Sequence, residues 1–401
     1  MCLRQKIYRP TSRFAIHFAV MKIRFENSMP LAADYLNAFG SAEGFESGTL
    51  TPEDLVDVDV LAVRSTTKVN ADLLNCANRL ALVATATAGY NHIDTQYLQQ
   101  QGIYWTSAAG CNAQAVAEYV LSVLANAHLS NKLDLHTATV GIVGAGHVGT
   151  ALSGLLDALS VRYKLYDPPL QEAGDTRTFA DWQSIIACDV ITLHVPLITG
   201  EYFPTEHMID AAVLAQLNAQ QLLINACRGE VIDEAALKNR LLSENAPTVV
   251  LDVFNNEPGI DQTLLPLIWL ATPHIAGHSI EGKLLGTQRV YEAVCELQGS
   301  TPELTLDDFI APPDAVELPA LDSSPESALS LVLKAILSVY DISEDDRHFR
   351  QGLADQVAFT FMRKHYRVRR ELAGHQVVAH SPLPQAAIAM LNALGMHPKT
   401  V

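Results

Sequence analysis

Short apolar segments alternate with segments of helical length along most of the chain, from residue 21 to about residue 300. The apolar segments are continuous, rich in β-branched residues and bounded by turn residues, as expected of strands buried on both faces of a parallel sheet. Strands are predicted at residues 58–63, 80–86, 139–143, 161–166, 190–195, 222–225 and 249–253. This alternation predicts an α/β fold built from βαβ units.

A glycine-rich turn follows the strand predicted at 139–143. Gly144, Gly146 and Gly149 form the pattern G-x-G-x-x-G, and His147 and Val148 lie between its second and third glycines. The pattern comes directly after a strand and opens a helix, whose free N–H groups are expected to hold the pyrophosphate of a dinucleotide. The sequence therefore predicts a Rossmann cofactor site that contains these five residues.

Asp167 ends the next predicted strand, 18 residues after Gly149. A carboxylate at this position accepts hydrogen bonds from the adenosine ribose and repels the 2′-phosphate of NADP. The alternative is a turn residue before Pro168 and Pro169. Together with the glycine pattern, Asp167 favours NAD as the cofactor.

The glycine pattern lies in the middle of the strand series, although a Rossmann sheet carries it after its first strand. The strands before residue 110 are therefore expected to form a different sheet, joined to the Rossmann sheet by a long helix at 112–128. The predicted fold has two Rossmann- or flavodoxin-like parallel-sheet domains and a small α+β C-terminal domain. The predicted boundaries are 21–111 with 281–305 for a substrate domain, 112–280 for the NAD-binding domain, 306–325 for a linker and 326–401 for the C-terminal domain.

Composition limits the partners and the compartment. The 401 residues include 27 Lys+Arg and 44 Asp+Glu, and the formal charge of −17 repels phosphate backbones, so nucleic acid is not an expected partner. The six cysteines have no metal-binding spacing, so no metal is expected, and free thiols indicate a reducing compartment, the cytoplasm. No apolar run approaches the roughly 20 residues that span a bilayer. Residues 1–20 are basic and partly apolar, and we interpret them as a disordered extension, with a signal peptide as the alternative.

Three residues near predicted strand ends have the chemistry to transfer a hydride at C2 of a small 2-hydroxy acid. Arg228 follows one strand and can hold the substrate carboxylate, and His274 can take the hydroxyl proton because imidazole titrates near neutrality. Glu257 can orient the imidazole, and Asp252 can hold the nicotinamide carboxamide. Alone, each residue has an ordinary interpretation as a surface ion pair, a turn residue or a structural histidine. Their order behind a dinucleotide fold favours the catalytic interpretation.

Residues 21 to about 300 resemble the D-2-hydroxyacid dehydrogenase family. The resemblance rests on the glycine pattern, on Arg228, on Leu-Asp-Val-Phe at 251–254 with Glu257-Pro258, and on Thr-Pro-His-Ile-Ala-Gly at 272–277. It implies that Arg228 and Glu257 are active-site residues and that His274 is the proton donor and acceptor. The NAD contacts that it implies are Asp167, Ala226, Cys227, Arg228, Asp252 and Gly277.

Within this family, stretches at 63–70, 85–89, 109–113, 225–229 and 339–341 are most similar to a subfamily with an additional C-terminal domain. The resemblance implies a homodimer formed through that domain and a phosphorylated 2-hydroxy acid as substrate. It also implies that Ser65 and Thr87 contact the substrate. The subfamily usually has a tyrosine contact where this chain has His278, so the contact at this position stays open.

A phosphorylated substrate needs cations beyond Arg228, which must lie beside C2. Arg64 is the first candidate, because it flanks Ser65, and Lys68 is nearby in the sequence. A second candidate is a basic run in the tail, for which a solvated helix face is the alternative. The run consists of Arg363, Lys364, Arg367, Arg369 and Arg370.

Two other functions are compatible with parts of this pattern. The same chemistry could act on another acid, such as 3-phosphoglycerate or hydroxypyruvate, but the additional tail domain argues against this. A non-catalytic NAD-sensing scaffold is known on the same fold in co-repressors, but the complete set of Arg228, Glu257 and His274 argues against that function.

Overall fold

The computed structural model describes residues 20–318 and 327–401, and these divide into two compact units. Unit 1 contains the described residues up to Asn112 together with Ser279–Ala311. Unit 2 contains Ala113–His278 and Pro312–Val401. Residues 1–19 of the predicted extension and residues 319–326, most of them in the predicted linker, lie outside the described residues.

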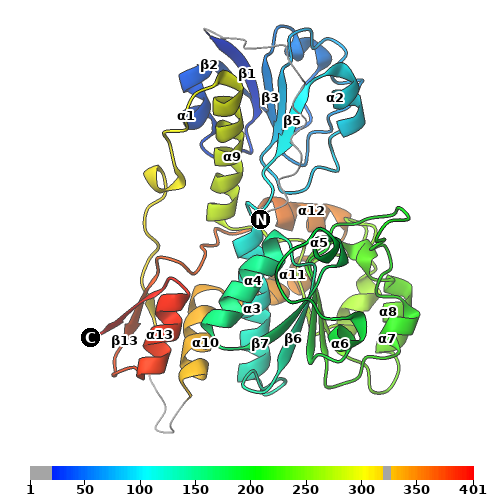
Figure 1. Cartoon of the computed structure of the whole chain (residues 1–401), viewed down its shortest axis with the longest axis vertical. Coiled ribbons are helices and arrows are strands. Elements are labelled where there is room, and N and C mark those ends of the chain that lie inside the picture. Colours follow the sequence, from blue (N-terminus) through cyan, green and yellow to red (C-terminus); the bar gives the residue numbers. More distant parts are fainter. Residues whose placement is uncertain (1–19, 319–326) are drawn as a thin grey trace. The chain divides into compact units, whose positions relative to one another are not determined.

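Unit 1 is built on a five-stranded parallel sheet with the order β2-β1-β3-β4-β5 (Figure 1). This is the flavodoxin-like order, in which the chain direction across the sheet reverses between β1 and β3. The strands are β1 (Met21–Glu26), β2 (Gly40–Phe45), β3 (Val60–Val63), β4 (Leu82–Thr85) and β5 (Tyr104–Ser107). The helices are α1 (Ala32–Leu36), α2 (Thr95–Gln101) and α9 (Ile280–Gln298), with short 3-10 turns at Asn37–Phe39, Pro52–Leu55 and Leu306–Asp308.

Unit 2 contains a six-stranded parallel sheet with the order β11-β10-β9-β8-β6-β7, so the direction reverses between β6 and β8. The strands are β6 (Thr139–Val143), β7 (Arg162–Tyr166), β8 (Val190–Leu193), β9 (Leu222–Asn225), β10 (Thr248–Leu251) and β11 (Leu270–Ala271). The helices are α3 (Ala113–Leu129), α4 (His147–Ala158), α5 (Pro168–Glu172), α6 (Trp182–Ile186), α7 (Ala211–Leu214) and α8 (Glu234–Leu241), with 3-10 turns at Gly229–Val231 and Gln262–Leu267. The predicted separation of two parallel sheets is confirmed.

Alternate strand residues in unit 2 pack into cores on opposite faces of the sheet. Val190 faces one core, whereas Ile191 and Leu193 face the other. Ile224 and Leu223 divide between the two cores in the same way. A parallel sheet covered on both faces explains why its strands are continuous apolar runs in the sequence.

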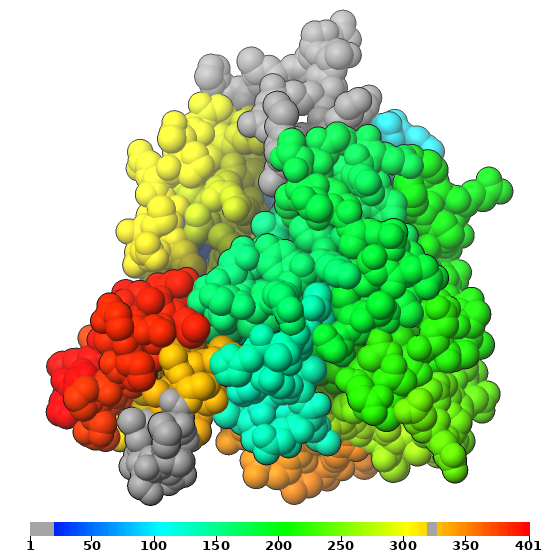
Figure 2. Space-filling view, turned by 60° about the horizontal axis from the view of Figure 1, so that its bottom comes forward, coloured from blue at the N-terminus to red at the C-terminus, as the bar shows by residue number. Residues whose placement is uncertain are grey.

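The C-terminal segment of unit 2 forms a small third sheet, with the strand order β12-β13-β14. Its elements are β12 (Val316–Glu317), α10 (Ala328–Val339), α11 (Ile342–Gly352), α12 (Gln356–Lys364), β13 (Gln376–Ala379), α13 (Gln385–Ala393) and β14 (His397–Thr400). Helix α10 packs against α3, and its apolar residues belong to the same core as α3 and the Rossmann sheet. Figure 2 shows the C-terminal residues, in orange and red, against the surface of the same unit. The predicted division of this segment into a separate domain stays a prediction.

Within residues 20–318 and 327–401, none of the helices has the length and apolarity needed to cross a membrane.

Candidate active site

The glycine turn of unit 2 packs tightly at two of its three glycines. Gly144 has φ +93°, and a Cβ atom there would lie 2.5 Å from the carbonyl oxygen of His194. A Cβ atom at Gly149 would lie 2.2 Å from the carbonyl oxygen of Gly144. At Gly146, in contrast, a Cβ atom would meet nothing within 4 Å. Gly144 and Gly149 are therefore required by the fold itself, whereas Gly146 borders open space.

Helix α4 begins at His147, and Val148 lies in its first turn. Its N-cap residue, Gly146, provides no side-chain hydrogen bond to the helix. The first N–H groups of α4 therefore lack a side-chain cap, and the space beside Gly146 is open. This arrangement fits the pyrophosphate of a dinucleotide, which needs a close backbone approach and free N–H donors.

Asp167 follows β7 at the same edge of the sheet. One carboxylate oxygen accepts the N–H of Ala145 at 2.8 Å, and the other accepts the N–H of Leu170 at 3.0 Å. The residue thus caps the short helix α5 and holds the glycine turn. The alternative of a turn residue is met in part, because Asp167 is the N-cap before Pro168. The predicted contact of Asp167 with the ribose stays a prediction.

Arg228 follows β9 and is partly buried. Its Nη1 donates to the carbonyl oxygen of Cys227 at 2.7 Å, and its own carbonyl oxygen accepts from Asn225 Nδ2 at 2.9 Å. Among residues 20–318 and 327–401, no carboxylate forms an ion pair with its guanidinium. A Cβ atom at Gly229 would lie 2.2 Å from the backbone of Phe254, so glycine lets this turn reach the loop after β10.

Glu257 and His274 form a hydrogen-bonded pair. Glu257 Oε2 lies 2.7 Å from His274 Nδ1, and Glu257 Oε1 accepts the N–H of Phe254 at 2.9 Å. The side chains are 18% and 29% exposed, so the pair is accessible to a ligand. Because the carboxylate accepts from Nδ1, the Nε2 atom of His274 is left for a substrate. The predicted orientation of the imidazole by Glu257 matches this geometry.

Asp252 is buried and organises the loop that carries His274. Its oxygens accept the hydroxyl of Thr272 at 2.7 Å and the N–H groups of Ile275 and Ala276 at 2.7 and 2.9 Å. Burial raises the pKa of Asp252, and a positive charge on His274 acts in the opposite direction. The predicted contact with the nicotinamide carboxamide stays a prediction, as does the contact at Gly277, which ends this loop.

Cys227 and Ala226 complete the turn after β9. The N–H of Cys227 donates to Asn225 Oδ1 at 3.1 Å, and burial raises the pKa of the Cys227 thiol to about 11. A thiol with this pKa is neutral at physiological pH, so its contribution to a cofactor site is its shape and its backbone. Ala226 is partly buried beside it.

In unit 1, a buried carboxylate holds the loop of the predicted substrate residues. Glu26, at the end of β1, accepts the N–H of Arg64 and the hydroxyl groups of Ser28, Thr66 and Thr67. Burial opposes its ionisation, but these four hydrogen bonds outweigh burial and lower the pKa of Glu26. The loop after β3 is thereby fixed, and it presents Ser65 as an exposed side chain.

The other predicted substrate residues have different surroundings. Thr87 lies after β4, where its hydroxyl donates to the carbonyl oxygen of Gly89 at 2.8 Å. Arg64 Nη1 donates to the carbonyl oxygen of Ser28 at 3.0 Å. His278, in unit 2, places its ring edge-on to Tyr366 with the centroids 5.9 Å apart.

The basic run of the tail is not a solvated helix face, because α12 ends at Lys364. Arg367 binds Asp345 at 3.1 Å. Arg369 is only 3% exposed, and its guanidinium donates to the carbonyl oxygens of Ala276 and Ala115 at 3.0 and 2.6 Å. Nothing in the sequence around Arg369 signals this burial, because its partners lie 93 and 254 residues away.

The fold and the site together define an NAD-dependent dehydrogenase. Residues 112–276 match the family described as D-isomer specific 2-hydroxyacid dehydrogenase, NAD binding domain, and residues 313–395 match a domain of unknown function. The chain is 50% identical to the erythronate-4-phosphate dehydrogenase of Pseudoalteromonas atlantica over 361 residues, which cover 89% of this chain and 95% of that one. It is 41% identical to the enzyme of that name from Psychromonas ingrahamii over 88% of this chain and 91% of that one. The chain belongs to the erythronate-4-phosphate dehydrogenase family of D-2-hydroxyacid dehydrogenases.

Solved structures share the fold at low sequence identity. An NAD-bound 3-phosphoglycerate dehydrogenase from Entamoeba histolytica has a TM-score of 0.59 at 22% identity and covers 73% of this chain and 100% of that one. A D-lactate dehydrogenase from Aquifex aeolicus, complexed with NAD and lactic acid, has a TM-score of 0.56 at 23% identity, with 69% and 96% covered. The predicted α/β fold with parallel sheets is confirmed.

Proposed function

We propose that the chain oxidises 4-phospho-D-erythronate to (R)-3-hydroxy-2-oxo-4-phosphooxybutanoate with NAD, as a step of pyridoxal 5′-phosphate biosynthesis. The substrate comes from the names of the relatives, which match nearly the whole chain. The observation that carries the catalytic assignment is the 2.7 Å bond between Glu257 and His274. A scaffold that only senses NAD has no need of an oriented imidazole with one nitrogen left over.

The residues of unit 2 divide the chemical work between them. Arg228 holds the substrate carboxylate, as a guanidinium does through two parallel hydrogen bonds. His274 Nε2 accepts the proton of the C2 hydroxyl, and Glu257 stabilises the imidazolium that results. NAD, held by the glycine turn and Asp167, would supply the acceptor for the hydride that leaves C2. Loss of one proton and one hydride converts the hydroxyl carbon to the 2-oxo carbon.

The remaining site residues bind rather than react. Gly144, Gly146, His147, Val148 and Gly149 form the pyrophosphate turn, whose geometry fits a dinucleotide. Asp167 accepts from the ribose hydroxyls and favours NAD over NADP. The other proposed NAD contacts are Ala226, Cys227, Asp252 and Gly277, and the proposed substrate contacts are Ser65, Thr87, His278 and Arg64.

The direct test is NADH formation with 4-phospho-D-erythronate, compared with 3-phosphoglycerate and, in the reverse direction, hydroxypyruvate. We expect the highest kcat/KM for 4-phospho-D-erythronate. A higher value for one of the other acids would change the substrate but keep the chemistry. NAD binding without turnover of any acid would support the scaffold and contradict the proposal.

We also propose that the chain is a cytoplasmic homodimer joined through its tail. Val357 and Phe361 lie four residues apart on α12 and are 75% and 59% exposed, and Val368 is 76% exposed. The exposed apolar pair on α12 fits a second copy of the chain. Replacing Val357 and Phe361 by Glu should halve the mass measured by light scattering, whereas Leu242→Glu, a change at another exposed apolar residue, should leave it unchanged.

A further inference from the structure

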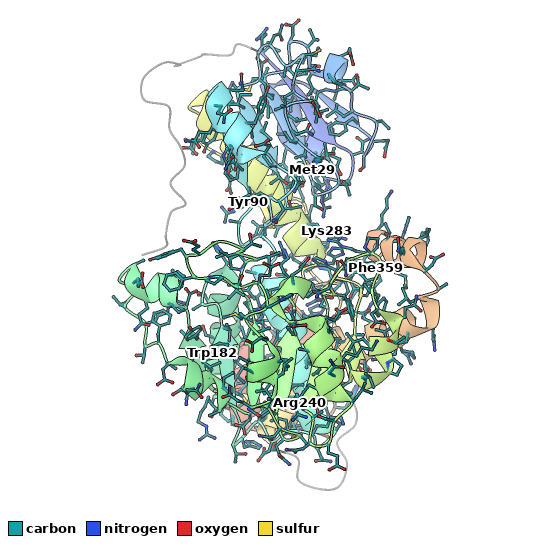
Figure 3. The ribbon with its side chains drawn as sticks, turned by 90° about the vertical axis from the view of Figure 1, so that its right-hand side faces the viewer. Met29, Tyr90, Trp182, Arg240, Lys283 and Phe359 are labelled. Carbon is teal, nitrogen blue, oxygen red and sulfur yellow. The ribbon has the colours of Figure 1, made fainter. Side chains whose placement is uncertain are left out.

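A second cation, on the first turn of α9 in unit 1, lies within electrostatic range of Arg64. Lys283 is half-buried there, and Figure 3 labels it on this helix. A Cβ atom at the neighbouring Gly282 would lie 3.1 Å from the carbonyl oxygen of Cys111, which follows β5. Arg64 follows β3 of the same parallel sheet, so the start of α9 and Arg64 both lie at the carboxyl edge of that sheet.

The charges of this edge act on one another. Burial lowers the pKa of Lys283, and the positive charge of Arg64 lowers it further. Burial raises the pKa of Cys111 to about 11, and the charge of Arg64 opposes this rise. Within the part of the chain that the structure describes, no carboxylate pairs with the Lys283 ammonium. Two cations beside the positive end of a helix repel one another, and an anion between them removes this repulsion.

We propose that Arg64 and Lys283 together form the subsite for the phosphate group of the substrate, which rests on the function proposed above. The subsite lies at the carboxyl edge of the sheet, near the reversal between β1 and β3, where ligands bind in sheets of this order. Arg64 supplies a planar fork, and Lys283 supplies a mobile point charge. The bond from Arg64 to the carbonyl oxygen of Ser28 and the anchoring of the loop by Glu26 fix the fork in place.

The first test compares 4-phospho-D-erythronate with D-erythronate in the wild type and in Lys283→Met. We expect KM for the phosphorylated acid to rise about 10-fold to 100-fold, the range of one charge-assisted hydrogen bond, with little change for D-erythronate. Lys283→Arg should recover most of the loss. Lys22→Met is the control, because Lys22 is an exposed lysine at the start of β1, whereas the proposed subsite lies at the edge where β1 ends. Its KM for both acids should resemble that of the wild type. Equal losses on both acids would overturn the subsite.

The second test uses inorganic phosphate and needs no substrate. Calorimetric titration should show phosphate binding to the wild type and to Lys22→Met, and much weaker binding to Lys283→Met and Arg64→Met. Equal binding by all four proteins, or none by the wild type, would overturn the subsite. If the wild type binds phosphate through Lys283 but does not oxidise 4-phospho-D-erythronate, the subsite stands and the proposed function fails.

An independent observation concerns Arg369 of the tail. Its guanidinium lies 3.6 Å from the ring centroid of Tyr340 and donates to the carbonyl oxygen of Ala276. Ala276 lies two residues after His274, and its N–H donates to Asp252. The loop of the catalytic histidine is therefore held from one side by the Rossmann strand β10 and from the other by the tail.

We infer that Arg369 is a positioning residue for His274, and that this is one function of the tail segment. A cation buried among carbonyl oxygens and an aromatic face is costly to remove or shorten, because the carbonyl groups then lose their donors. The tail thereby makes the geometry of the catalytic loop depend on a residue 93 positions away from that loop.

Arg369→Met should lower kcat about 10-fold or more while the KM for NAD changes less than about twofold, because the loop, not the glycine turn, is displaced. Arg369→Lys should recover part of the loss, since lysine can reach one of the two carbonyl oxygens. Arg367→Met, a neighbouring change in an arginine that pairs with Asp345, is the matched control. Thermal unfolding verifies that each variant is folded. A folded Arg369→Met enzyme with normal kcat, or a loss shared equally by kcat and NAD binding, would overturn the inference.

Discussion

Replacing Glu257 by Gln isolates the contribution of one carboxylate oxygen. Gln has nearly the same shape, and its amide oxygen can still accept the N–H of Phe254, now 2.9 Å from Oε1. The substitution therefore replaces the other oxygen, Oε2, which lies 2.7 Å from His274 Nδ1. An acceptor is replaced there by an NH₂ donor.

The expected consequence is a change in the protonated nitrogen of His274. A donor facing Nδ1 favours the form in which Nδ1 accepts and Nε2 carries the hydrogen. Nε2 then cannot accept the C2 hydroxyl proton, and the imidazolium loses its neighbouring negative charge. The lost charge-assisted hydrogen bond accounts for about 1.5–3 kcal/mol, which is roughly 10-fold to 100-fold in rate. With the wrong nitrogen protonated as well, the expected loss in kcat is about 10²–10⁴-fold.

The assay is steady-state NADH formation with 4-phospho-D-erythronate, together with NAD binding followed by fluorescence. NAD affinity should be unchanged, because the glycine turn is not altered. Glu234→Gln is the matched control: Glu234 accepts the N–H of the neighbouring Asn255 at 3.0 Å, but no bond joins it to the imidazole. A Glu257→Gln enzyme with near-normal kcat, or one whose defect lies only in NAD binding, would refute the reasoning.

Three further predictions test other parts of unit 2. Asp167→Asn keeps an acceptor for the N–H of Leu170 but removes the negative charge. The ratio of kcat/KM with NADP to kcat/KM with NAD should therefore rise about tenfold or more. A wild type that already used NADP as well as NAD would contradict the role of Asp167. Gly229→Ala should lower the free energy of unfolding by about 1–3 kcal/mol, measured by thermal denaturation, whereas Gly146→Ala should weaken NAD binding without this loss. Burial raises the pKa of Glu118 to about 8, although the hydrogen bonds from Gln114 and Leu372 act in the opposite direction. The stability that this shift contributes is complete below pH about 4.5 and is lost as the pH rises to about 8, by up to about 1.4 kcal/mol per pH unit, and Glu118→Gln should flatten this decline.

Most of the strands that could be predicted have two buried faces; β7, an edge strand with one buried residue, was predicted as well. β6, β8 and β9 are continuous apolar runs because both faces of the sheet are covered, and they coincide with the predicted strands to within two residues. β2 was not predicted, since it is an edge strand with the sequence Gly-Ser-Ala-Glu-Gly-Phe and few apolar residues. Its position comes from pairing with β1, which the local sequence does not encode.

The proposed catalytic residues could be predicted from the sequence because their chemistry places them near strand ends in a fixed order along the chain. Arg228, Glu257 and His274 all have this character. Lys283, in contrast, is one lysine on a helix, and its half-buried place near Arg64 depends on the packing of α9. The role of Glu26 could not be predicted either, because three of its four hydrogen-bond partners are 38 to 41 residues away in the sequence. Interactions between distant segments leave no periodic signal in the sequence.

The acidic net charge is compatible with an anionic substrate because two of the acids that hold the proposed binding loops are buried. Glu26 and Asp252 are each almost fully buried, and their oxygens accept hydrogen bonds from the loops that they hold. These donors compensate the two carboxylates locally. Among residues 20–318 and 327–401, neither Arg228 nor Lys283 forms an ion pair that would cancel its charge. A carboxylate placed against either cation would stabilise the unliganded protein and compete with the substrate. In the described part of the chain the two cations therefore have no acidic partners, and the two buried acids hold the loops instead. Binding of a carboxylate and a phosphate requires this arrangement.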